Sequence, residues 1–144
     1  MTFPIAIVAS RFNEAVTEKL LEGALARLEE MRFVQSQITV IRVPGAVEIP
    51  VTAQKLARSN RYGAILCLGA VIRGETTHYD SVCRQVSDGC ARVALDFSLP
   101  VIFGVLTTEN EAQAHDRAGG SHGHKGRDSV DTAIEMVRVL GQIA

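Results

Sequence analysis

One turn of the sequence combines an anion-binding backbone with a proton carrier. It runs from Gly74 through Glu75, Thr76 and Thr77 to His78, between an apolar run and an amphipathic segment. Free N–H groups at a helix N-terminus bind anions, threonine hydroxyls add donors, and an imidazole exchanges protons near neutral pH. On spacing alone, a capping turn that exposes a histidine explains the same residues.

Three further turns carry polar or glycine residues after apolar runs, at 11–13, 44–48 and 107–110. In the second of these, Glu48 either complements a helix N-terminus or accepts hydroxyls of a polyol. Phe12, in the first, is either a packing residue or an aromatic ring that stacks on a planar ligand.

Arg117 and Lys125 flank a glycine- and histidine-rich loop at 119–124. They are either a solvated basic pair or a clamp for a phosphate or carbonyl group. The spacing of His115, His122 and His124 fits no standard zinc pattern, and we predict no metal site.

Two phosphate-binding motifs are excluded. Residues 69–74 resemble a P-loop only superficially, because Glu75 stands where the phosphate-binding lysine is required. The first apolar run lacks a following G-x-G-x-x-G motif, so a dinucleotide site is unsupported.

The elements that must position these turns alternate along the chain. Apolar and β-branched runs predict strands at 4–10, 38–43, 64–72 and 100–107. Apolar residues at helical spacing predict helices that we place at 14–32, 47–59, 79–97, 110–118 and 126–143. Asn13 is the expected N-cap of the first helix, and Pro50 is tolerated in the first turn of the second.

This alternation predicts an α/β fold: a three-layer α/β/α sandwich with a four-stranded parallel sheet, flavodoxin-like, in a single domain over 1–144. Ligands of such folds bind beyond the carboxyl ends of the strands. The four turns should therefore converge, which is stronger evidence for a site than any one of them.

Composition narrows the class of protein. A net charge of -1 and a pI of about 6.4 point to no nucleic-acid or anionic-membrane partner. We expect no transmembrane segment, since no apolar run approaches the roughly 20 residues that span a bilayer, and no signal peptide. The three cysteines, Cys67, Cys83 and Cys90, are expected to be reduced and mostly buried, which favours a cytoplasmic location.

Several segments together resemble the lumazine synthase family, in order and over nearly the whole chain. They are RFN at 11–13, PGAVEIP at 44–50, GAVIRGETTHYD at 69–80, FGVLTTEN at 103–110, QAxxRAG at 113–119 and KG at 125–126. The resemblance implies a transferase that makes 6,7-dimethyl-8-ribityllumazine from 5-amino-6-(D-ribitylamino)uracil and 3,4-dihydroxy-2-butanone 4-phosphate in riboflavin biosynthesis. It also implies no metal or organic cofactor, and active sites between the subunits of a homopentamer.

The resemblance assigns roles by position. His78 matches the proton-transfer residue, Phe12 the aromatic that stacks on the pyrimidine, and Arg117 the phosphate-binding arginine. Lys125 matches a contact to the pyrimidine, and Asp128 an acidic residue that orients the arginine. The resemblance also implies that Phe103, Arg117 and Lys125 come from an adjacent subunit. The remaining substrate-binding positions are Asn13, Gly45, Ala46, Val47, Glu48, Ala70, Val71, Ile72, Gly74, Glu75, Thr76 and Phe103.

Two departures from the family bear on assembly. The first expected strand begins almost at once, whereas typical members have a longer N-terminal segment that adds a strand to a neighbour's sheet. His124 stands where members usually have Asn, and Ser121 where many have Lys. We expect pentamers as the building unit and leave a sixty-subunit shell open. The alternative functions are an archaeal-type riboflavin synthase and a non-catalytic flavin-binding or shell protein.

Overall fold

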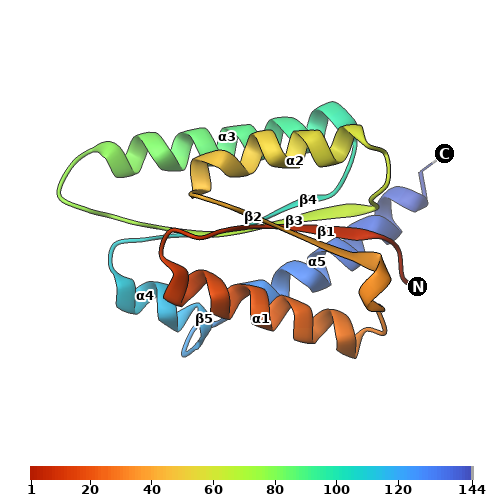
Figure 1. Cartoon of the computed structure of the whole chain (residues 1–144), viewed down its shortest axis with the longest axis horizontal. Coiled ribbons are helices and arrows are strands. Elements are labelled where there is room, and N and C mark those ends of the chain that lie inside the picture. Colours follow the sequence, from red (N-terminus) through yellow and green to blue (C-terminus); the bar gives the residue numbers. More distant parts are fainter. Residues whose placement is uncertain (144) are drawn as a thin grey trace.

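The computed structural model describes residues 1–143 and is built on one parallel sheet (Figure 1). Its strands are β1 (Ile5–Ser10), β2 (Ile38–Val43), β3 (Ala64–Ile72) and β4 (Val101–Thr108), in the order β2-β1-β3-β4. This order is typical of flavodoxin-like folds, and it confirms the predicted parallel sheet. All four strands therefore end on the same edge of the sheet.

Helices cover both faces of the sheet (Figure 1). α2 (Ile49–Arg58) and α3 (His78–Phe97) lie on one face, and α1 (Glu14–Glu30), α4 (Glu111–Asp116) and α5 (Lys125–Gly141) lie on the other. The predicted three-layer sandwich is confirmed. Within residues 1–143, no helix has both the length and the apolar character needed to cross a membrane.

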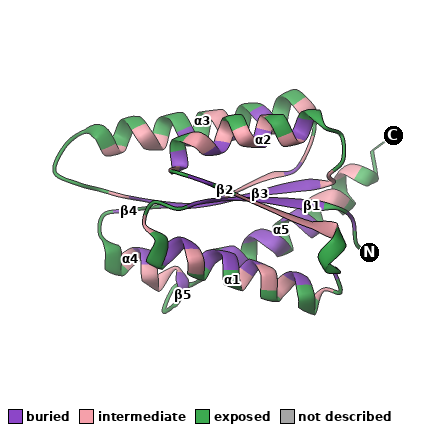
Figure 2. Cartoon of the chain, viewed as in Figure 1, coloured by how far each residue is buried: buried purple, intermediate pink, exposed green. Residues whose placement is uncertain are grey.

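Burial on both faces explains why the strands are continuously apolar. Every residue of β1 is buried, and so are all residues of β3 except the last (Figure 2). Ile7 and Leu66 point to the α1–α5 side, whereas Val8 and Cys67 point to the α2–α3 side. Two apolar clusters thus hold the layers together and leave the strand ends rigidly placed.

Four short elements were not among the predicted ones. A 3₁₀ turn, η1 (Gln35–Gln37), precedes β2, and a second, η2 (Ala46–Glu48), precedes α2, so α2 begins later than expected. The predicted loop at 119–124 contains an antiparallel pair, β5 (Ala118–Gly120) with β6 (Gly123–His124). Glycines at positive φ permit this hairpin, at 108° for Gly119 and 81° for Gly123.

Two residues at the ends of α1 adopt left-handed backbone conformations. Arg32, at φ 71°, lies just beyond the C-terminus of α1 and explains why this helix ends earlier than the predicted range. Asn13 occupies the N-cap position at φ 66° but makes no side-chain capping bond. Its amide instead donates to the carbonyl of Ala70 in β3 at 2.9 Å, so Asn13 is the N-cap residue by position, as predicted, while its side chain contacts β3.

Candidate active site

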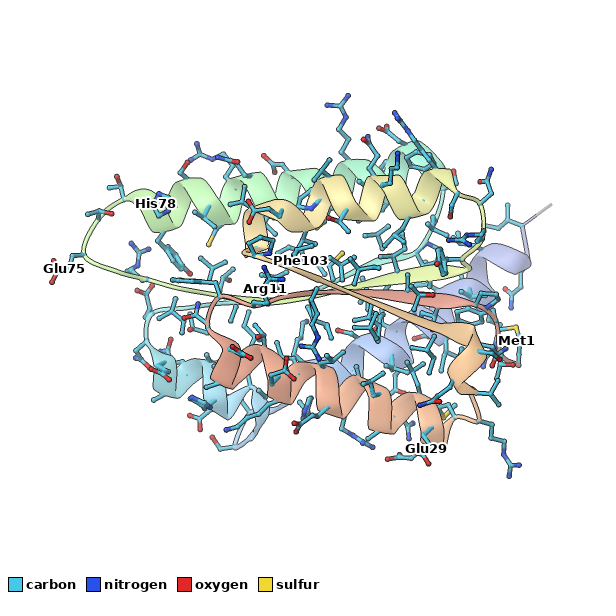
Figure 3. The ribbon with its side chains drawn as sticks, viewed as in Figure 1. Met1, Arg11, Glu29, Glu75, His78 and Phe103 are labelled. Atoms are coloured by element: carbon cyan, nitrogen blue, oxygen red, sulfur yellow. The ribbon has the colours of Figure 1, made fainter. Side chains whose placement is uncertain are left out.

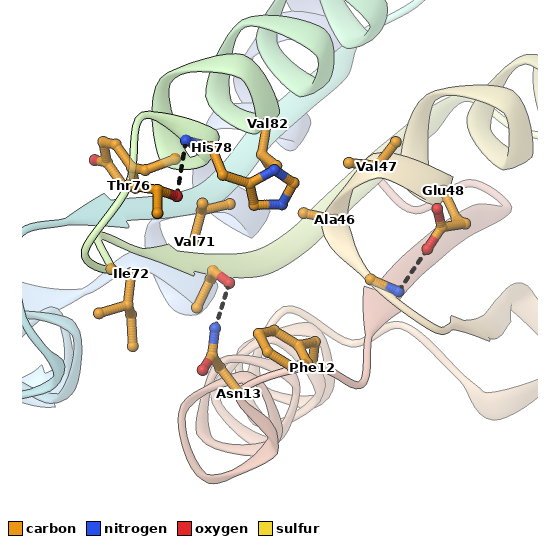
Figure 4. Close-up of a pocket in the computed structure, with 14 residues that line it drawn as sticks. Phe12, Asn13, Ala46, Val47, Glu48, Val71, Ile72, Thr76, His78 and Val82 are labelled. Atoms are coloured by element: carbon orange, nitrogen blue, oxygen red, sulfur yellow. Dashed lines mark hydrogen bonds between the residues drawn. The ribbon is translucent and has the colours of Figure 1, made fainter.

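A cavity of about 300 Å³ lies at the carboxyl ends of β1 and β3, between η2 and the start of α3 (Figure 4). Turns that follow β1, β2 and β3 meet there, as predicted, but the fourth predicted turn, 107–110, contributes no residue to the lining of this cavity. Its wall is mainly apolar, with a few polar groups. The lining residues are Phe12, Asn13, Gly45, Ala46, Val47, Glu48, Ala70, Val71, Ile72, Gly74, Thr76, His78, Tyr79 and Val82.

The turn after β1 is fixed by backbone bonds to the end of β2. The N–H of Arg11 donates to Val43 at 2.8 Å, and that of Phe12 donates to Pro44 at 2.9 Å. Phe12 is nevertheless 71% exposed. A rigid backbone that holds an aromatic ring open to solvent suits stacking on a planar ligand.

The turn after β2 is closed by its own carboxylate. Glu48 Oε1 accepts the N–H of Gly45 at 2.9 Å. The sequence left two roles open for Glu48, a contact at a helix N-terminus and a contact to a polyol. This bond corresponds to the first of them. Because Glu48 also lines the cavity, its carboxylate is still placed to meet a hydroxyl of a ligand.

The turn after β3 presents backbone and imidazole to the same space. A Cβ added at Gly74 would meet no atom within 4 Å, so the backbone there is open to approach. Thr76 Oγ1 accepts the N–H of His78 at 3.3 Å. In Figure 4 the imidazole of His78 and the ring of Phe12 face the cavity from opposite sides.

Arg73 ties this turn to the end of β4. Its N–H donates to Thr108 at 2.9 Å, and its guanidinium forms ion pairs with Glu109 at 2.6 Å and Asp80 at 3.3 Å. The guanidinium also lies over the Tyr79 ring, 4.4 Å from its centroid. Burial raises the pKa of the Tyr79 phenol.

A second cavity, of about 400 Å³, lies against the edge strand β4 and the start of α5. Arg117 Nη1 donates to the Gln113 carbonyl at 2.9 Å, and the N–H of Lys125 donates to the Arg117 carbonyl at 2.8 Å. These bonds fix the Arg117 guanidinium and join the backbones of the two basic residues, and both residues line one opening. The lining residues are Val105, Leu106, Thr107, Thr108, Arg117, His122, Lys125 and Asp128.

Comparison with known proteins identifies the family. A sequence model of 6,7-dimethyl-8-ribityllumazine synthase matches residues 2–141. The chain is also 56% identical, over 142 residues, to the 6,7-dimethyl-8-ribityllumazine synthase of Coxiella burnetii strain Dugway 5J108-111, covering 99% of this chain and 94% of the relative. The same figures hold for the enzyme of that name from strain CbuG_Q212. The chain belongs to the 6,7-dimethyl-8-ribityllumazine synthase family.

The residues that resemble the lumazine synthase site fall into three groups. Most line the first cavity, and Arg117, Lys125 and Asp128 line the second. Glu75 is exposed at the tip of its turn and points away from the sheet (Figure 3). Phe103 is half-buried in β4 against the α2–α3 side of the core, and it is not among the described residues that line either cavity.

Seven cavity-lining residues were not assigned to the site from the sequence. Tyr79 and Val82 line the first cavity, and the second is also lined by Val105, Leu106, Thr107, Thr108 and His122. Val82 could have been found, because it follows His78 by four residues and so shares its helix face. His122 was treated only as part of a possible metal group, and within residues 1–143 no three ligand-type side chains are placed to hold a metal.

Proposed function

We propose that the first cavity binds 5-amino-6-(D-ribitylamino)uracil and 3,4-dihydroxy-2-butanone 4-phosphate and condenses them to 6,7-dimethyl-8-ribityllumazine. Membership of the lumazine synthase family supports this reaction, which is a step of riboflavin biosynthesis. The observation that carries the assignment to this site is the meeting of Phe12, His78 and the open Gly74 backbone around one apolar cavity.

The pyrimidine is proposed to stack on Phe12 against the apolar wall of Val71 and Ile72. The ribityl chain then extends toward Ala46, Val47 and Glu48, where a carboxylate oxygen accepts one of its hydroxyls. The remaining polar groups, including the Asn13 side chain held against Ala70, limit how the two substrates can be arranged. Holding two flexible reactants in one geometry lowers the entropic part of the barrier.

Each chemical step moves a proton that His78 is placed to carry. The 5-amino group attacks the ketone of the butanone phosphate. The ketone oxygen then leaves as water, which gives an imine. Phosphate then leaves by elimination, and the ribityl-bearing amine closes the second ring with loss of a second water. General acid–base catalysis by one positioned imidazole can serve all of these transfers.

The first cavity contains no cation for the phosphate among its described lining residues, whereas the second cavity carries Arg117 and Lys125. We therefore propose that the second cavity of one subunit meets the first cavity of its neighbour, in a ring of five. Arg117, oriented by Asp128, would bind the phosphate together with the turn at 74–76, and Lys125 and Phe103 would contact the pyrimidine. The single domain, 1–144, is proposed to act in the cytoplasm.

The activity is tested with the purified protein and both substrates. We expect fluorescent lumazine and inorganic phosphate to appear together, and no product above the uncatalysed rate would refute the proposal. Lumazine alone is the control. Its conversion to riboflavin would indicate the riboflavin synthase alternative, and flavin binding without turnover would indicate the non-catalytic one.

The shared site is tested by co-expressing His78→Ala and Arg117→Ala subunits and assaying them with the butanone phosphate well below its wild-type KM, where each variant alone is strongly impaired. Random mixing rebuilds about a quarter of the sites with both residues intact, so activity should return to about a quarter of the wild-type rate. The matched control combines His78→Ala with the double variant His78→Ala/Arg117→Ala, which rebuilds no site. Equal activity in both mixtures would place Arg117 and His78 within one subunit.

A further inference from the structure

The N-terminus of α5 is capped by a single side chain, that of His124. Its Nδ1 accepts the N–H groups of Gly126 at 3.1 Å and Arg127 at 3.2 Å. The first N–H groups of a helix have no partner within the helix, so an acceptor at this position fixes where the helix begins. An Nδ1 that accepts hydrogen bonds carries no proton, so the neutral ring is protonated at Nε2.

The His124 ring is enclosed by glycines from three different elements. A Cβ added at Gly23 of α1 would lie 2.1 Å from the ring, one at Gly126 of α5 3.0 Å, and one at Gly119 of β5 3.3 Å. Any side chain at Gly23 would therefore displace the imidazole. The ring thus joins α1, the β5–β6 hairpin and α5 at one point, which we call the glycine cradle.

The same point fixes the backbone of both cations of the second cavity. His124 pairs with Ala118 across the hairpin, directly after Arg117. Lys125 follows His124, and its N–H donates to the Arg117 carbonyl at 2.8 Å. A shift of the His124 ring would therefore move Arg117 and Lys125 relative to each other and to Asp128, which lines the same opening.

We propose that His124 is a positioning residue for binding of the phosphorylated substrate. By capping α5 from within the glycine cradle, it holds Arg117 in place to bind the phosphate, next to the backbone of Lys125. This inference rests on the proposed function, because Arg117 and Lys125 act on substrate only if the second cavity completes an active site. His124 itself does not line either cavity among the described residues.

The kinetic test compares His124→Ala with His124→Asn. Asparagine is a strong N-cap, so it can replace the acceptor that alanine lacks. We expect His124→Ala to raise KM for the butanone phosphate roughly five- to tenfold while kcat changes less than about twofold, and His124→Asn to restore most of the loss. The control is His115→Ala, which removes a histidine of α4 that lines neither cavity and should leave both constants unchanged.

A measurement without turnover separates this proposal from the proposed function. Inorganic phosphate, titrated into each variant by calorimetry, should bind His124→Ala more weakly by the same factor. An active wild type with unaltered KM and phosphate affinity in His124→Ala would overturn the positioning role and leave the function intact. Equal KM and equal phosphate affinity in His124→Ala and His124→Asn would also overturn it, because capping of α5 would then have no effect on phosphate binding.

The glycine cradle is tested by a double-mutant cycle with Gly23→Ala. In the wild-type background the new methyl group collides with the His124 ring, so we expect a lower Tm. In His124→Ala that space is open, and the higher helix propensity of alanine should raise Tm by a few degrees. Equal shifts of Tm in the two backgrounds would show that the ring does not occupy the cradle.

Discussion

The two cavities of this chain differ in what they are made of and in what they can bind. The first, at the ends of β1 and β3, has an apolar wall with one imidazole and an exposed phenylalanine. The second, at the edge strand β4, has two cations, a carboxylate and threonine hydroxyls. The first suits a planar ring, and the second suits an anion.

This difference explains why neither cavity suffices for a substrate pair in which one partner is a pyrimidine and the other a phosphate ester. An apolar wall gives an aromatic ligand its binding energy but leaves a phosphate without a counter-charge. A basic opening supplies the counter-charge for a phosphate but lacks an apolar wall for an aromatic ring. Under the proposed meeting of the two cavities across a subunit boundary, assembly becomes a condition of activity, and a lone monomer is expected to be inactive.

The largest predicted effect concerns the chemistry of the first cavity. His78→Gln keeps a side chain of similar length but cannot carry the protons, so kcat should fall by about a hundredfold. KM for the butanone phosphate should change little, because His78 is not proposed to bind the phosphate. Steady-state kinetics with each substrate varied in turn measures both constants, and a rise in KM with kcat preserved would contradict the assigned role.

Removing the arginine of the second cavity should have the opposite signature. Arg117→Ala deletes a charge-assisted hydrogen bond to phosphate, so KM for the butanone phosphate should rise about tenfold to a hundredfold. KM for the pyrimidine should change far less. Arg92→Ala, on α3 and 80% exposed, removes an arginine away from both cavities and is the control. Equal effects of His78→Gln and Arg117→Ala on every constant would remove the distinction between the cavities.

A smaller effect is expected at Arg73, which joins the turn after β3 to the end of β4. Arg73→Lys keeps the charge but loses the planar group that lies over Tyr79 and contacts both Asp80 and Glu109. The turn at 74–76 should then be less ordered, and kcat/KM should fall roughly threefold to tenfold. Thermal unfolding provides the control measurement, since a large drop in Tm would assign the loss to stability instead.

The fold was largely predictable from the sequence because its signals are local. Strands buried on both faces need continuous apolar runs, and Ile5–Ser10 and Ala64–Ile72 are such runs. The helix boundaries were predicted less well. The end of α1 depends on the left-handed backbone of Arg32, and the β5–β6 hairpin depends on two glycines at positive φ. Neither conformation has a strong periodic signal.

The site was predictable only in part, because the spacing of residues along the sequence does not determine which of them lie close together in the fold. The strand-end rule correctly brought Phe12, Glu48 and His78 together. It could not show that Asn13 bonds across to Ala70, because that contact joins residues 57 positions apart. Nor could it show that the ring of His124 fits the space left by Gly23. A glycine within a helical segment does not indicate which distant residue packs against it.

The smallest predicted effect concerns the layer that carries the second cavity, where ion pairs join α1 to α5. Glu30 accepts two bonds from Arg127, at 2.9 and 3.0 Å, and one from Arg27 at 2.9 Å. The bonds from Arg127, followed by that from Arg27, lower the pKa of the Glu30 carboxyl from 4.5 to about 2. A lowered pKa in the folded state means that the ionised carboxylate stabilises the fold above pH 4.5.

That stabilisation should be lost as the pH falls from 4.5 to about 2, where Glu30 becomes protonated in the folded state as well. Glu30→Gln removes the charge at every pH, so its Tm should lie slightly below that of the wild type at pH 7 and converge with it toward pH 2. The exposed pair is screened, so 1 M salt should reduce the difference at pH 7.

Phosphate affinity in the same variant extends the comparison of the two cavities. A loss of affinity would mean that the α1–α5 contact also sets the geometry of the basic opening, whereas unchanged affinity would leave that task to the glycine cradle.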